Sequence, residues 1–180
     1  MAYKIIPAEK HGFGKLVHMI LLLSTVVMGV IGIYAVFKYH DRIQVPQMAT
    51  LHSWTGIATI TLFGFQWLLG FVIFMFPKAP RQMRAKLAPW HAFIGLALFL
   101  MGICSIQTGL SEQFIFSGLD VHGKQARLMN FIGISSLLYG IAVALAHVEE
   151  LLEEMHYGPE EQVDDANNLE KGIEHREQLI

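Results

Sequence analysis

The chain has 180 residues, of which 53% are apolar and 16% are charged, with a formal net charge of −2. Together with a mean hydropathy of +0.44, this composition is high for a soluble domain and normal for a small membrane protein. The one cysteine, Cys104, excludes a disulfide framework and a cysteine-based metal site. We also expect no nucleic-acid partner.

Four apolar segments are long enough to cross a hydrocarbon core about 30 Å thick, which takes roughly 20 helical residues each. They are Leu16–Phe37, Leu51–Phe76, Trp90–Leu110 and Leu128–His147. Because they are continuous rather than alternating, they are typical of helices. The predicted fold is therefore all-α, an integral membrane bundle of four transmembrane helices formed by residues 1–147.

The remaining segment, residues 148–180, carries eleven acidic residues against Lys171 and Arg176. This charge bias predicts a solvated, largely disordered tail that is helical at most as far as Met155.

Basic residues predict the orientation in the membrane through the positive-inside rule. The stretch after the second apolar segment carries four of them and no acid: Lys78, Arg81, Arg84 and Lys86. We therefore expect this stretch, the N-terminus and the C-terminal tail in the cytosol. The membrane would be the plasma membrane or a vacuolar or endosomal membrane.

Two of the nine histidines, His18 and His91, lie at matching depth on different predicted helices, near the cytosolic side. Two neutral imidazoles are what six-coordinate haem iron needs, whereas zinc takes three or four ligands. Gly95, one turn after His91, would leave room for a porphyrin edge on the same helix face. An alternative is that such histidines, near Trp54 or Trp90, belong to the interfacial aromatic belt.

Five motifs occur in register: KLVH, IYAVFKYH, LHSW, PWHAFIG and MNFIG. In this order they resemble the cytochrome b561 family, and the plant-type members most of all. The resemblance covers residues 1–147. It implies a six-span protein with two b haems that moves electrons from cytosolic ascorbate to monodehydroascorbate or ferric iron opposite. It also implies a homodimer in a lipid bilayer.

The resemblance implies haem ligands residue by residue. His18 and His91 match the axial pair of the cytosolic-side haem b, and His52 matches one ligand of the second haem. Glu112 matches a carboxylate near that outer haem, and a solvated helix cap is the equal alternative.

The resemblance also implies substrate positions. Lys15 and Arg84 match cations of an ascorbate pocket, although any inner surface of a membrane protein is basic. His40 matches a histidine of the acceptor or iron site. Gln66, an amide in the middle of the second segment, needs a partner on a neighbouring helix or on the route between haems.

The chain departs from the family by having four spans of six. The partner of His52 would then belong to a preceding span, and Met1 would be an internal methionine of a longer protein or the start of a short isoform. We expect impaired transmembrane transfer for this reason. Two alternatives stay open: a non-catalytic isoform that modulates full-length partners, and a one-haem b subunit of a dehydrogenase.

Overall fold

Four α-helices make up the part of the chain that the computed structural model describes, residues 11–177. They are α1 (His11–Ile43), α2 (Leu51–Phe74), α3 (Arg81–Phe116) and α4 (Lys124–Glu177). Within these residues there is no strand. Each helix contains a segment long and apolar enough to cross a membrane, and in α4 this segment ends at Glu150. The prediction of an all-α bundle with four membrane-length helices is confirmed, whereas the expectations about Met1 lie outside the described residues.

The described chain forms two units. The first ends at Gly140 and contains α1, α2, α3 and the beginning of α4, and the second begins at Ile141 and contains the rest of α4. In the second unit, helix continues to Glu177, past the limit of Met155 expected from the sequence. Glutamate, the commonest acidic residue of this segment, and leucine are good helix formers, so a charge bias alone does not prevent a helix.

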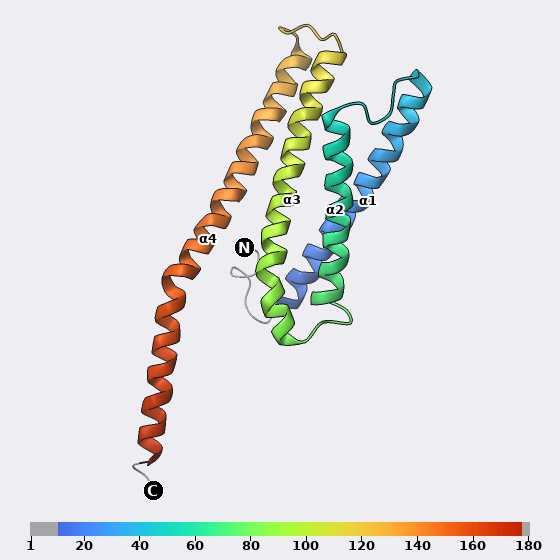
Figure 1. The fold of residues 1–180 in the computed structure, drawn as a ribbon. Coiled ribbons are helices and arrows are strands. Elements are labelled where there is room, and N and C mark those ends of the chain that lie inside the picture. The colour runs from blue at the N-terminus through green and yellow to red at the C-terminus, as the bar shows by residue number, and fades with distance from the viewer. Residues whose placement is uncertain (1–10, 178–180) are drawn as a thin grey trace. The chain divides into compact units, whose positions relative to one another are not determined.

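Within the first unit the helices alternate in direction. Figure 1 shows α1 and α3 running one way and α2 the other, so the starts of α1 and α3 lie at the same end. The backbone of α2 packs against both α1 and α3, and no direct backbone packing joins α1 to α3 in the described chain. The middle helix therefore determines how far apart its two neighbours stand.

The outer surface of this bundle is apolar. Leu21 is 62% exposed and Phe65 is 61% exposed, and many other large apolar side chains are similar. An apolar surface of this extent would be a liability in water, whereas lipid covers it without cost. Polar side chains accordingly find partners inside the bundle; Gln107, for example, donates from Nε2 to the carbonyl of Gly133 at 2.9 Å.

Helix α3 begins at Arg81 rather than at Trp90, so Arg84 and Lys86 lie on a helix and not in a loop. The segment RQMRAKLA consists of good helix formers, and Pro80 precedes its first turn. Pro89 lies inside the helix and removes one backbone donor. Helix α1 likewise extends to Ile43, which places His40 in its last turns rather than beyond them.

A glycine lets α1 approach α2 closely. A Cβ atom on Gly29 would lie 2.6 Å from Cδ1 of Ile60 on α2, whereas a Cβ on Gly32 would meet nothing within 4 Å. Only the first position is therefore sterically closed to a side chain.

We predict that Gly29→Ala destabilises the purified protein by about 1–3 kcal/mol, because it overpacks the α1–α2 contact. Gly32→Ala, the matched control on the same helix, should be neutral or slightly stabilising because alanine has the higher helix propensity. The measurement is thermal unfolding in detergent, followed by the loss of monodisperse protein. Adding Ile60→Val, which removes Cδ1, should restore stability to Gly29→Ala; equal stability of the two alanine variants would contradict the contact.

Candidate functional site

Two of the histidines singled out above come together near the shared starts of α1 and α3. His18 lies in the second turn of α1 and is exposed, and His91 lies in α3 and is half-buried. The two helices start at the same end of the bundle, as Figure 1 shows. The backbones of α1 and α3 do not pack on each other, and each packs on α2.

The donor set at this end suits haem iron rather than a bare ion. No group of three or more histidine, cysteine or acidic side chains able to hold a metal occurs within the described residues. A porphyrin supplies four nitrogens itself, so the protein needs to add only two axial ligands. In addition, a Cβ on Gly95 would meet nothing within 4 Å, which leaves that face of α3 open one turn from His91. The residues present therefore fit a haem held by His18 and His91.

A stripe of α2 holds the ring of His91. Gln66 Nε2 lies 2.9 Å from His91 Nδ1 and also donates to the His91 carbonyl oxygen at 2.8 Å. One turn later, a Cβ on Gly70 would lie 2.8 Å from Cε1 of His91. A further turn on, the ring of Phe74 lies 5.3 Å from the His91 ring, centroid to centroid, tilted by 58°. The helix–helix partner expected for Gln66 is thus the candidate ligand itself.

The neighbouring residue on α2 reaches the other axial helix. Trp67 donates its indole Nε1–H to the carbonyl of Met19 at 3.0 Å, directly after His18 in sequence. Trp67 also stacks on Phe71, with ring centroids 5.7 Å apart. Consecutive side chains of α2, Gln66 and Trp67, therefore contact both helices that carry His18 and His91.

Two cations expected at an ascorbate pocket lie near the same end. Lys15 precedes His18 by one turn on α1, and Arg84 lies in the first turn of α3; both are half-buried. Arg84 donates from Nε to the carbonyl of Ala79 at 3.1 Å, which anchors its guanidinium to the connection between α2 and α3. A guanidinium carries five N–H donors, and this bond uses one of them.

At the opposite end of the bundle the two helices exchange roles: α2 carries the imidazole of His52, and α3 supplies the residues that contact it. His52 lies in the first turn of α2, and its Nδ1–H donates to the carbonyl of Ser105 on α3 at 3.0 Å. A Cβ on Gly109, one turn after Ser105, would lie 2.7 Å from Cε1 of His52. Since Nδ1 carries the proton, Nε2 keeps the lone pair that a metal needs.

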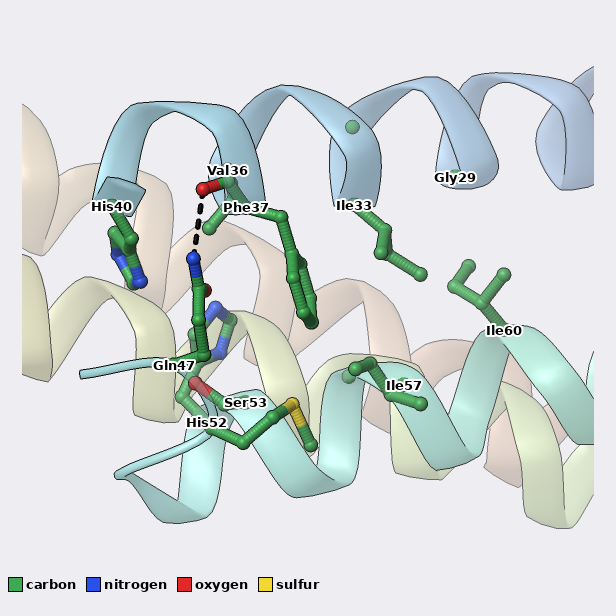
Figure 2. Close-up of a pocket in the computed structure, with 13 residues that line it drawn as sticks. Gly29, Ile33, Val36, Phe37, His40, Gln47, His52, Ser53, Ile57 and Ile60 are labelled. Carbon is green, nitrogen blue, oxygen red and sulfur yellow. Dashed lines mark hydrogen bonds between the residues drawn. The ribbon is translucent and has the colours of Figure 1, made fainter. Parts of the chain in front are cut away.

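A cavity of about 230 Å³ lies between α1 and α2 at this end, and both His40 and His52 line it. Figure 2 shows the two imidazoles at one end of the cavity with Gln47 beside them, and Gln47 Nε2 donating to the Phe37 carbonyl at 2.8 Å. The Nδ1 of His40 is buried and has no hydrogen-bond partner. An unpartnered buried nitrogen favours a ligand or a proton acceptor at this place.

Glu112 belongs to a capping network of α2. It accepts a hydrogen bond from Thr50 Oγ1 at 2.8 Å, and Thr50 in turn accepts from the backbone N–H of Ser53 as the N-cap of α2. Glu112 and His52 also line a second, more open cavity between α2 and α3. The carboxylate is thus part of the capping network of α2 and lies beside His52, and its expected role near an outer haem stays a prediction.

Sequence reasoning missed the residues against which the two rings pack: Gly70, Phe74, Ser105 and Gly109. It considered a glycine that lies on the same helix as a candidate ligand, namely Gly95. The signal that could have found the others is the four-residue spacing of a polar residue and a glycine, Gln66–Gly70 and Ser105–Gly109, on neighbouring helices.

Comparison with known proteins shows which family the chain resembles. The family model of eukaryotic cytochrome b561 matches residues 1–117. A rice (Oryza sativa subsp. japonica) protein named probable ascorbate-specific transmembrane electron transporter 1 is 40% identical over 164 residues, which are 88% of this chain and 70% of the rice protein. Transmembrane ascorbate ferrireductase 1 of Arabidopsis thaliana is 38% identical over 148 residues, 81% of this chain and 62% of that protein.

A bovine (Bos taurus) lysosomal membrane ascorbate-dependent ferrireductase is 33% identical over 132 residues, 70% of this chain and 50% of the bovine protein. The family match covers more than half of the chain, and the relatives come from plants and animals. The chain therefore belongs to the eukaryotic cytochrome b561 family.

Proposed function

We propose that the chain is an oxidoreductase that takes electrons from cytosolic ascorbate through a b-type haem held by His18 and His91 and passes them toward the opposite side of the membrane. Relatives named as ascorbate-specific electron transporters and ascorbate ferrireductases support ascorbate as donor and ferric iron as acceptor. The observation that carries the proposal is the pair of imidazoles on two helices, each of which adjacent side chains of α2, Gln66 and Trp67, hold by hydrogen bonds. With no third protein donor in the described chain, that pair suits iron in a porphyrin.

The haem, when bound, supplies a one-electron carrier. The rest of the work falls to the side chains of this chain. His18 and His91 would bind the haem from two helices; Gln66 and Phe74 hold the ring of His91, and the apolar ring of Phe74 lowers the dielectric beside it. A low dielectric favours the state with less net charge and thereby tunes the potential of the site.

Ascorbate is a monoanion at neutral pH, so its site needs cations beside the inner pair. Lys15 and Arg84 supply them from the first turns of α1 and α3. We place this end in the cytosol because Lys78, Arg81 and Lys86 lie there without a neighbouring acid. Guanidinium offers paired donors to a planar oxyanion, which favours Arg84 as the orienting residue and Lys15 as a point charge.

For the outer end we propose an acceptor region built around His52 and His40. The lone pair on His52 Nε2 is available, and His40, whose buried Nδ1 has no hydrogen-bond partner, lines the same cavity. One haem near one leaflet leaves about half of a ~30 Å core uncrossed. We therefore propose that this chain by itself is reduced by ascorbate readily and transfers electrons across the membrane slowly. The expected homodimer and the choice of membrane stay predictions.

We predict that purified protein made with ample haem shows an ascorbate-reducible b-type band in its reduced-minus-oxidised spectrum, and that His91→Ala removes the inner-haem part of it. The physical reason is the loss of one axial nitrogen. The matched control is His122→Ala, an exposed histidine in the connection between α3 and α4, which should leave the band intact.

A wild-type protein without any ascorbate-reducible band would favour a non-catalytic isoform. A haem that a dehydrogenase reduces and ascorbate does not would favour a b subunit of such an enzyme. Equal spectra for His91→Ala and wild type would contradict the ligand assignment.

We further predict that Arg84→Gln raises the ascorbate concentration for half-maximal haem reduction by roughly tenfold, since a charge-assisted hydrogen bond contributes about 1.5 kcal/mol or more. The haem spectrum and the reduction rate with a neutral quinol should not change. Lys86→Gln removes the same charge from an exposed position of the same helix and serves as control. An equal effect of both substitutions would show a diffuse charge effect in place of a pocket.

A further inference from the structure

The amide of Gln66 makes two hydrogen bonds to one residue, and that residue is His91. Nε2 lies 2.9 Å from the imidazole Nδ1 and 2.8 Å from the backbone carbonyl oxygen. An –NH₂ group can only donate, so Nδ1 accepts and the imidazole proton is on Nε2 in this arrangement. This is the tautomer that cannot bind a metal through Nε2.

His52 provides the comparison within the same molecule. Its Nδ1–H donates to a backbone carbonyl, that of Ser105, at 3.0 Å, which fixes the tautomer with a free Nε2 lone pair. Both rings also lie against a glycine four residues after the polar partner: Gly70 after Gln66, and Gly109 after Ser105. The two sites thus share one design and differ in the hydrogen-bonding group, a fixed carbonyl for His52 and a rotatable amide for His91.

We infer that Gln66 is a positioning residue that controls His91: when Nε2 of His91 binds iron, the amide turns by half a rotation, gives up its bond to the His91 carbonyl and accepts the Nδ1–H with Oε1. No proton leaves the site, because the imidazole exchanges one tautomer for the other. The inference rests on the proposed function, since it assigns Gln66 a part in the haem site of His18 and His91.

The surroundings of the amide restrict it to this role. Gln66 is half-buried in the middle of α2, where an amide without a partner is costly. Gly70 has no side chain that would displace the ring of His91. Phe74, one turn further along α2, packs on that ring. The orientation of the ring is therefore set by Gly70 and Phe74 of α2, and Gln66 makes the hydrogen bond to Nδ1.

An acceptor on Nδ1–H makes an imidazole a stronger electron donor to iron and so stabilises the ferric state. Removing the acceptor should favour the ferrous state. For Gln66→Leu we expect about a tenfold shift of the ferrous-to-ferric ratio at fixed potential, which corresponds to ~59 mV for a one-electron couple. Gln66→Glu keeps an oxygen acceptor and should give a potential at or below that of the wild type.

The test is a redox titration of the purified full chain, read at the haem step that His91→Ala loses. Gln107→Leu is the matched control: Gln107 is also a half-buried amide, and it donates to the Gly133 carbonyl at 2.9 Å and to Ser136 Oγ at 2.8 Å, far along α3 from His91. The inference predicts a raised potential for Gln66→Leu, a restored or lowered one for Gln66→Glu, and no shift for Gln107→Leu.

Three outcomes would overturn it. They are an unchanged potential in Gln66→Leu, the same shift in Gln66→Leu and Gln107→Leu, and a shift of Gln66→Glu in the same direction as Gln66→Leu. In each, wild type still binds haem and the proposed function stands. If wild type itself binds no haem, the proposed function fails, and this inference fails with it.

Discussion

The arrangement of this bundle depends on a reciprocal contact between α2 and α3, in which each helix seats an imidazole of the other against a glycine. His91 of α3 lies on Gly70 of α2, and His52 of α2 lies on Gly109 of α3. A methyl group at either glycine would come within 3 Å of the ring. In lipid, where no hydrophobic force brings helices together, such close packing and interhelical hydrogen bonds are what associate them. Structure and candidate chemistry therefore rest on the same contacts.

The central helix has consequences for both sides of the bundle. Gln66 donates a hydrogen bond to the carbonyl of His91 on α3. Trp67 donates one to the carbonyl of Met19, the residue after His18 on α1. The separation of the two imidazoles is thus set by adjacent residues of one helix, which does not itself supply a ligand to the inner site. At the other end the same helix begins with His52, capped by Thr50 and linked through it to Glu112. One rigid element therefore organises the inner pair and the first turn of the outer region.

Much of this could be predicted from the sequence, because lipid imposes strong rules. Long apolar runs must be helices, and the alternation of connections places His18 and His91 at one end. The ends of the helices were less predictable. Arg84 and His40 lie in helices because helix propensity continues past the apolar run, and hydropathy does not measure helix propensity. The contact of Gln66 with His91 also required coordinates, since a single sequence shows that an amide needs a partner and does not say which neighbouring helix faces it. The four-residue spacing of Gln66 and Gly70 became meaningful only when α3 was seen to lie on that stripe.

The central claim is that imidazoles from α1 and α3 bind one iron from opposite sides. The most direct measurement is the electron paramagnetic resonance spectrum of the oxidised, purified chain at low temperature, because axial ligation by two histidines gives low-spin ferric haem. The account predicts a low-spin signal of the bis-imidazole type that is lost in His18→Ala as well as in His91→Ala. A high-spin ferric signal in the wild type, or a low-spin signal that persists without His18, would contradict it.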